Sequence, residues 1–150
     1  MNTGVILDKL RELIVPRLSA QNPLRDAFFV EVADAKQPEQ VRTCAVLQVS
    51  YSQARELIAG NYTWQYPCRC WARFYPPQGN WDAEQLRGWM NEAGLALVAA
   101  LGALMAVPVE EQRAAGFIML DAVCTGGVSW RADADEGYVG EVPFMLTVQF

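Results

Sequence analysis

The final segment of the chain, residues 138–150, constrains the fold more than any other because apolar side chains recur there at every second position. Side chains alternate between the two faces of a β-strand, so this period of two predicts a strand with one buried face. The residues expected on that face are Tyr138, Val142, Phe144, Leu146, Val148 and Phe150, with Gly140 in the same phase. Such a strand needs a second layer to cover its apolar face.

Residues 62–75 alternate in the same way and predict a second long strand. One face carries Tyr62, Trp64, Tyr66, Cys68, Cys70, Ala72 and Phe74, and the other carries Thr63, Gln65, Pro67, Arg69, Trp71, Arg73 and Tyr75. At about 3.3 Å per residue this segment would span more than 40 Å, which is longer than most strands. Because proline has no N–H to donate, Pro67 predicts a bulge, an edge position or a break into two strands.

Two segments have helical patterns. Residues 3–18 repeat leucine and isoleucine along one helical stripe, and Pro16 predicts that this helix ends or kinks just before it. Residues 82–105 are rich in leucine and alanine and begin with Asp82, which can cap the helix. Both helices therefore have apolar surfaces that can cover a sheet.

The remaining segments predict shorter elements. They are strands at 28–33 and 42–51, a short helical turn at 52–61, a central strand at 117–125 and a strand at 128–131. The acidic turn 133–137 is expected to join the strand at 128–131 to the final strand in a hairpin. Hairpin-linked strands favour antiparallel pairing. The whole chain, residues 1–150, is thus predicted to be a single α+β domain, with a mostly antiparallel or mixed sheet and two main helices packed on one face.

Composition narrows the possible functions. Apolar residues make up 52% of the chain and charged residues only 19%, compared with about 25% in a typical globular protein. Either the core is unusually large, or a partner covers part of an apolar surface. The net charge is −5 and the twelve Lys and Arg are scattered, which argues against tight or sequence-specific binding of nucleic acid. Histidine is absent, so the commonest general base and metal ligand is missing.

No catalytic or metal-binding motif emerges from the cysteines and acids. Cys68 and Cys70 share a strand face, but they lack the C-x2–4-C spacing of structural zinc sites and are interpreted as buried apolar residues, as are Cys44 and Cys124. The acidic turn 133–137 lacks the ligand spacing of a calcium loop and is interpreted as a solvated turn. Asp121, the one acid in an apolar strand, is expected to meet an arginine, a cap or solvent. We therefore expect no enzyme activity, no cofactor and no metal.

The sequence also bears on location. No secretory leader pattern precedes the first helix, which predicts synthesis in the cytosol and reduced thiols. The longest apolar run, residues 93–107, is short for a membrane span and predicts a buried helix rather than a membrane segment.

Four alternating residues form the candidate interface: Arg69, Trp71, Arg73 and Tyr75. Trp, Tyr and Arg are the residue types that dominate binding hot spots. Three interpretations remain open for this face: a half-exposed sheet in which arginine stems cover aromatic rings, a subunit interface, or a platform that stacks nucleic-acid bases.

The order of elements resembles the tail terminator and tail completion proteins of long-tailed bacteriophages, including the small tail proteins of Mu-like phages. The resemblance lies in chain size, in an N-terminal helix at 5–18, in strand segments at 43–51 (TCAVLQVSY) and 68–74 (CRCWARF), in a Leu/Ala helix, and in the closing strand at 142–150 (VPFMLTVQF). It carries no matched functional residue.

The resemblance implies a virion structural protein that assembles in the host cytoplasm. Copies would form a ring, commonly a hexamer, that ends the tail tube and joins it to the head-neck connector. An acidic ring would let DNA pass through its lumen without sticking to it. The alternatives are another neck or tail-tube subunit, or a small-ligand binding domain or enzyme with an aromatic pocket.

Overall fold

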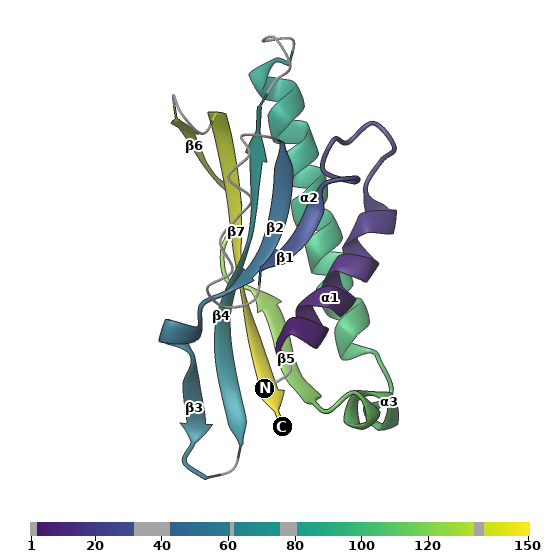
Figure 1. Ribbon diagram of the computed structural model, residues 1–150, viewed down its shortest axis with the longest axis vertical. Helices are drawn as coiled ribbons and strands as arrows, with labels where there is room; N and C mark the ends of the chain where they lie inside the picture. The colour runs from purple at the N-terminus through teal and green to yellow at the C-terminus, as the bar shows by residue number, and fades with distance from the viewer. Residues whose placement is uncertain (1–2, 32–42, 61, 76–80, 134–136) are drawn as a thin grey trace.

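The computed structural model describes residues 3–31, 43–60, 62–75, 81–133 and 137–150 (Figure 1). Helices α1 and α2 lie side by side on one face of a mixed seven-stranded sheet, so the predicted α+β class is confirmed (Figure 1). The elements are α1 (Thr3–Ile14), η1 (Val15–Arg17), β1 (Phe28–Glu31), β2 (Cys44–Val49), η2 (Tyr51–Gln53), β3 (Arg55–Ile58), β4 (Thr63–Phe74), α2 (Ala83–Met105), α3 (Val109–Ala114), β5 (Ile118–Cys124), β6 (Ser129–Asp133) and β7 (Gly137–Gln149).

The two long strands predicted from alternation, β4 and β7, form the centre of the sheet. They pair antiparallel along their whole length, from Thr63 opposite Gln149 to Phe74 opposite Tyr138. The sheet order is β1-β2-β4-β7-β5, with β3 added to β4 and β6 added to β7. All pairs are antiparallel except β1 with β2. The hairpin predicted between residues 128 and 138 corresponds to β6 and β7.

The buried face of the sheet has the predicted phase. In β7, Val142, Phe144, Leu146 and Val148 are each no more than 3% exposed, and in β4 the buried residues on the same side are Tyr66, Cys68, Cys70, Ala72 and Phe74. They pack against apolar residues of α1 and α2 in one continuous core. The prediction is wrong for Tyr138, which is 40% exposed at the start of β7, and for Tyr62, which is 67% exposed just before β4, because both lie where these strands leave the core.

Pro67 lies inside β4 without a break or a bulge. Its carbonyl accepts a hydrogen bond from the Ser50 backbone N–H at 2.8 Å, on the side of β4 that faces the end of β2. In a strand the N–H and C=O of one residue point to the same edge, so the missing N–H faces this side and not β7. Pairing there ends at Gln65 with β3 and resumes at Cys68 with β2. Pro67 therefore removes no hydrogen bond from the ladder between β4 and β7.

Local sequence signals set both helix boundaries. The α-helix α1 ends at Ile14 and gives way to the 3-10 turn η1, which contains Pro16. Helix α2 begins after Asp82, whose side chain accepts a hydrogen bond of 2.7 Å from the Gln85 backbone N–H. Both boundaries match the prediction. Proline inside a helix and an aspartate cap act on residues only a few positions away, so their effects can be predicted from the local sequence.

Two strand assignments need correction. Residues 55–58 form strand β3 instead of a helical turn, because they pair with the extended end of β4. Strand β5 is an edge strand instead of a central one: within the described part of the sheet it pairs only with β7, and Leu120 and Val123 are 48% and 46% exposed. Helix α3, which follows Pro108, was not expected. The predicted ends of the first strand (32–33) and the loops at 34–41, 76–80 and 134–136 lie outside the described residues.

Candidate interface on the open face of the sheet

The candidate interface lies on what we call the open face, the side of the sheet opposite α1 and α2 (Figure 1). Arg69, Trp71 and Arg73 occupy alternate positions of β4, and Tyr75 follows in the same phase just past its end. Their neighbours in sequence, Cys70 and Phe74 among them, are fully buried against the helices. Alternation within one strand therefore separates the protein core from a second surface that none of the described helices covers.

Trp71 is the centre of a small apolar cluster on the open face. It lies opposite Val46 of β2, and together with Cys44 the two form a cluster separate from the main core, with Phe29 of β1 packed at its margin. Only 6% of Trp71 is exposed. Of the three interpretations of this face, a half-exposed sheet does not hold for Trp71, because Val46, Cys44 and Phe29 pack around the indole.

Arg73 lies between two aromatic rings. Its guanidinium carbon is 5.7 Å from the Trp71 ring centroid and 5.9 Å from that of Tyr75, both within cation–π range. Three polar atoms here are buried yet have no hydrogen-bond partner within the described ranges: Trp71 Nε1, Arg73 Nε and the Tyr75 hydroxyl. We call these three residues the donor cluster.

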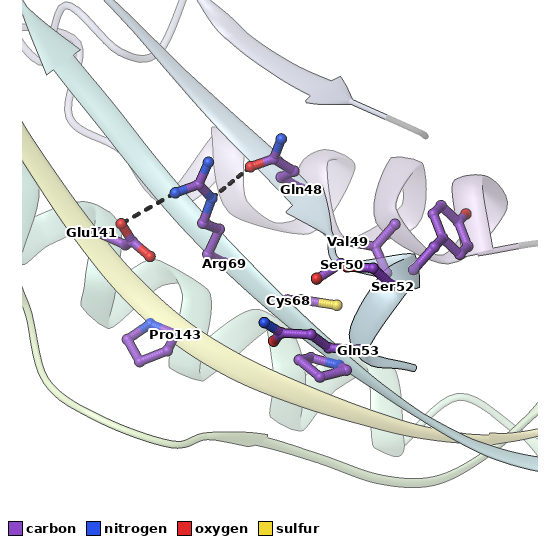
Figure 2. Close-up of a pocket in the computed structure, with 11 residues that line it drawn as sticks. Gln48, Val49, Ser50, Ser52, Gln53, Cys68, Arg69, Glu141 and Pro143 are labelled. Carbon is purple, nitrogen blue, oxygen red and sulfur yellow. Dashed lines mark hydrogen bonds and ion pairs between the residues drawn. The ribbon is translucent and has the colours of Figure 1, made fainter. Parts of the chain in front are cut away.

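Arg69 does not belong to the donor cluster. Its Nε donates to Gln48 Oε1 on β2, and its Nη1 lies 3.4 Å from Glu141 Oε2 on β7 (Figure 2). Both side chains of this ion pair are about 40% exposed, at 44% and 38%, so the pair adds little stability. The four predicted residues thus divide into a paired Arg69 and an unpaired donor cluster.

A groove of about 640 Å³ opens beside Arg69. It lies where β2 ends and η2 begins, and Figure 2 shows Arg69 and Glu141 at one end and the η2 residues at the other. Its lining is Gln48, Val49, Ser50, Tyr51, Ser52, Gln53, Pro67, Cys68, Arg69, Glu141 and Pro143. The sequence did not predict this groove, because it depends on the turn that η2 makes across the sheet.

Three of the four cysteines, Cys68, Cys70 and Cys124, are poor nucleophiles and poor metal ligands. Burial raises the pKa of the Cys70 thiol to about 12, with a smaller contribution from nearby Cys124, and burial also raises the pKa values of Cys68 and Cys124. A thiol must lose its proton to attack or to bind metal. Among the residues that the structure describes, no cluster of cysteines and acids could hold a metal ion.

We expect the free energy of unfolding to fall more steeply with pH above 9 in the wild-type protein than in Cys70→Ala. The folded chain keeps the Cys70 proton up to a pKa of about 12, whereas the ordinary thiol pKa is 9.0. The unfolded chain releases that proton first, so between these values one such group lowers stability by about 1.4 kcal/mol per pH unit. Urea unfolding at several pH values from 8 to 10.5 measures the slope. Equal slopes would contradict this ionisation.

Asp121 is exposed on the edge strand β5, and its Oδ1 accepts a hydrogen bond from the Ala122 backbone N–H at 3.0 Å. The sequence predicted that Asp121 meets an arginine, a cap or solvent, and the structure shows it facing solvent. Nothing about its position suggests a catalytic role.

Apolar side chains are also exposed on the helix side of the molecule, a feature that the sequence analysis did not predict. Leu95 is 73% exposed and Val98 is 55% exposed, both on the outer surface of α2. The available signal was the apolar character of this helix on all sides.

By length and composition, α2 is also the one helix in the described part of the chain that could cross a membrane, but the core helices of soluble proteins pass the same test. Helix α2 is longer than the apolar run 93–107, from which the sequence predicted a buried helix.

Neither a known protein family nor a curated protein sequence matches this chain.

Proposed function

We propose that this protein is a structural subunit that assembles with copies of itself, in the role of a tail terminator-like ring subunit of a long-tailed bacteriophage. In this role a ring of copies, commonly six, would cap the tail tube and join it to the head-neck connector of the virion. The proposal gives the chain no catalytic role and no cofactor.

One observation carries the proposal: the open face buries aromatic and cationic side chains whose hydrogen-bonding groups are left without partners. Buried polar groups in stable structures are almost always paired. A face that is apolar, rich in Trp, Tyr and Arg, and incompletely paired has the character of a protein interface. The exposed apolar residues on α2 and β5 add further surface that a neighbour can cover.

The shape of the sheet is consistent with repeated assembly. Strand β5 has an edge without a strand partner among the described residues, and β1 has another at the opposite end. Free strand edges are surfaces on which a second chain can dock. Contacts between two different edges of identical subunits are head-to-tail, and such contacts form a ring when the rotation between subunits closes and an open filament when it does not.

Sedimentation velocity of the wild-type chain tests the proposal directly. We expect species several times the monomer mass of 16.7 kDa, and electron micrographs of these species should show rings. Replacing both Trp71 and Arg73 with alanine should weaken association at least about tenfold, as expected of a hot-spot pair. Lys9→Ala, on the exposed surface of α1, is the matched control and should leave association unchanged.

The other outcomes distinguish the alternatives. A chain that stays monomeric at every concentration would contradict the ring and favour a ligand-binding domain, whose site would be the groove beside Arg69, because its volume is typical of ligand pockets. Particles that lack this protein separate the two structural roles: overlong tails indicate a terminator, whereas the absence of tails indicates a tube subunit.

A further inference from the structure

The donor cluster contains three hydrogen-bond donors, and none of them is paired within the described part of the chain. An indole N–H and a guanidinium N–H can only donate, and a phenol O–H can donate. Trp71 Nε1, Arg73 Nε and the Tyr75 hydroxyl are all buried and have no partner within the described part of the chain. Leaving buried donors unpaired costs free energy, so the cluster is incomplete without an acceptor.

The three donors belong to side chains that share one face at the end of a single strand. They occur at every second position of one strand end, about 7 Å apart along the chain, and the two aromatic rings flank the guanidinium at 5.7 and 5.9 Å. Glu141, which lies opposite Trp71 in the β4–β7 ladder, is already paired with Arg69 at 3.4 Å. Arg73 therefore presents a half-buried positive charge that no described carboxylate neutralises.

These features select an oxyanion. A cation or an amine would be repelled by Arg73 and could not accept hydrogen bonds from the indole. A carboxylate accepts several hydrogen bonds at once, and charge-assisted bonds to guanidinium groups are the strongest of these. Val46 and Phe29 make the surround of the indole apolar, and hydrogen bonds are stronger in such surroundings than in water.

We propose that Trp71, Arg73 and Tyr75 form a binding site for a carboxylate that a second copy of this chain supplies, and that this carboxylate approaches through Arg73 and Tyr75, which are only half-buried. This inference rests on the proposed self-assembly. The chain has seventeen acidic residues and twelve basic ones, so each copy has carboxylates to offer. Several exposed acids form no ion pair in the described ranges: Asp8, Glu12, Glu84, Glu110 and Glu111.

Variants that remove a single hydrogen-bond donor give the sharpest test. Trp71→Phe removes the indole N–H, and Tyr75→Phe removes only the hydroxyl. Because neither donor has a partner in the isolated chain, neither substitution should lower its midpoint of thermal unfolding by the loss of a hydrogen bond. Each should nevertheless weaken subunit association about tenfold, and Arg73→Gln should weaken it more. Trp89→Phe, on the helix side where the indole packs on Phe74, is the matched control and should not affect association.

Free acetate is the second probe. At a protein concentration low enough to dissociate the subunits, sodium acetate should raise the midpoint of thermal unfolding of the wild-type chain above that in sodium chloride at equal ionic strength. Arg73→Gln should abolish this difference. Acetate should also compete with assembly, because it would occupy the place of the neighbour's carboxylate.

The outcomes separate this inference from the proposed function. A wild-type ring that Trp71→Phe, Tyr75→Phe and Arg73→Gln leave intact would overturn the site and leave the ring standing. A monomer that acetate or inorganic phosphate stabilises through Arg73 would overturn both the ring and the second copy as the source, and would identify a site for a free oxyanion. The absence of any Arg73-dependent acetate effect would overturn the oxyanion chemistry itself.

Discussion

Phe144→Ala is expected to lower the free energy of unfolding by about 3–5 kcal/mol, the range for truncating a buried phenylalanine. Phe144 is 1% exposed and lies in the middle of β7, opposite Cys68 of β4 on one side and Cys124 of β5 on the other. Its ring packs in the core between the sheet and the helices, so alanine leaves a cavity that three adjoining strands cannot close. Urea unfolding followed by circular dichroism measures the change.

Met145→Ala is the matched control, one residue along the same strand. Met145 is half-buried and lies on the open face, so its truncation should cost the isolated chain about 1 kcal/mol or less. Equal losses for the two variants would contradict the deeper burial of Phe144 on the helix side of β7. Because the open face is the proposed interface, Met145→Ala can still weaken assembly, which sedimentation would detect separately from stability.

Gly137→Ala is expected to cost about 2–5 kcal/mol through backbone strain and a steric clash. Gly137 begins β7 with φ of +73°, and a Cβ built there would lie 2.4 Å from the Phe74 carbonyl oxygen. The left-handed backbone costs a side-chain-bearing residue about 1–2 kcal/mol, and overpacking adds about 1–3 kcal/mol. The clashing atom belongs to the backbone of the central strand β4, so it cannot move aside without disturbing the ladder.

Gly127→Ala controls for the general effect of replacing glycine. No heavy atom lies within 4 Å of a Cβ at Gly127, and its φ lies outside the left-handed region. The variant should therefore keep the wild-type stability or gain up to about 1 kcal/mol, because alanine restricts the unfolded chain. Thermal unfolding of the two variants side by side measures the contrast, and equal stability would mean that the turn before β7 relaxes freely.

The parts of the fold that could be predicted from the sequence depend on short-range patterns. Alternation in β4 and β7 predicted which residues are buried, and Asp82 predicted the start of α2. These signals are local because side-chain direction alternates within a strand and a cap acts within one helical turn. The mistaken strand assignments at β3 and β5 have the opposite cause: strand pairing and sheet position depend on residues far away in the chain.

The candidate interface shows the same division. Period two placed Arg69, Trp71, Arg73 and Tyr75 on one face, and the structure keeps them there. The sequence did not predict that Glu141 and Gln48 would pair with Arg69 while the Arg73 guanidinium would lie between two aromatic rings. Those partners come from β7 and β2, and their positions follow from the register of three strands.

The sequence alone therefore determined the two-sided character of the long strands, the helix limits at Pro16 and Asp82, and the residues of the open face. Tertiary structure decided which strand lies at an edge, which arginine has a carboxylate partner, and which buried donors remain unpaired. The physical reason is range: alternation and capping are settled within a few residues, whereas hydrogen-bond partners across a sheet exist only after distant strands have aligned in register.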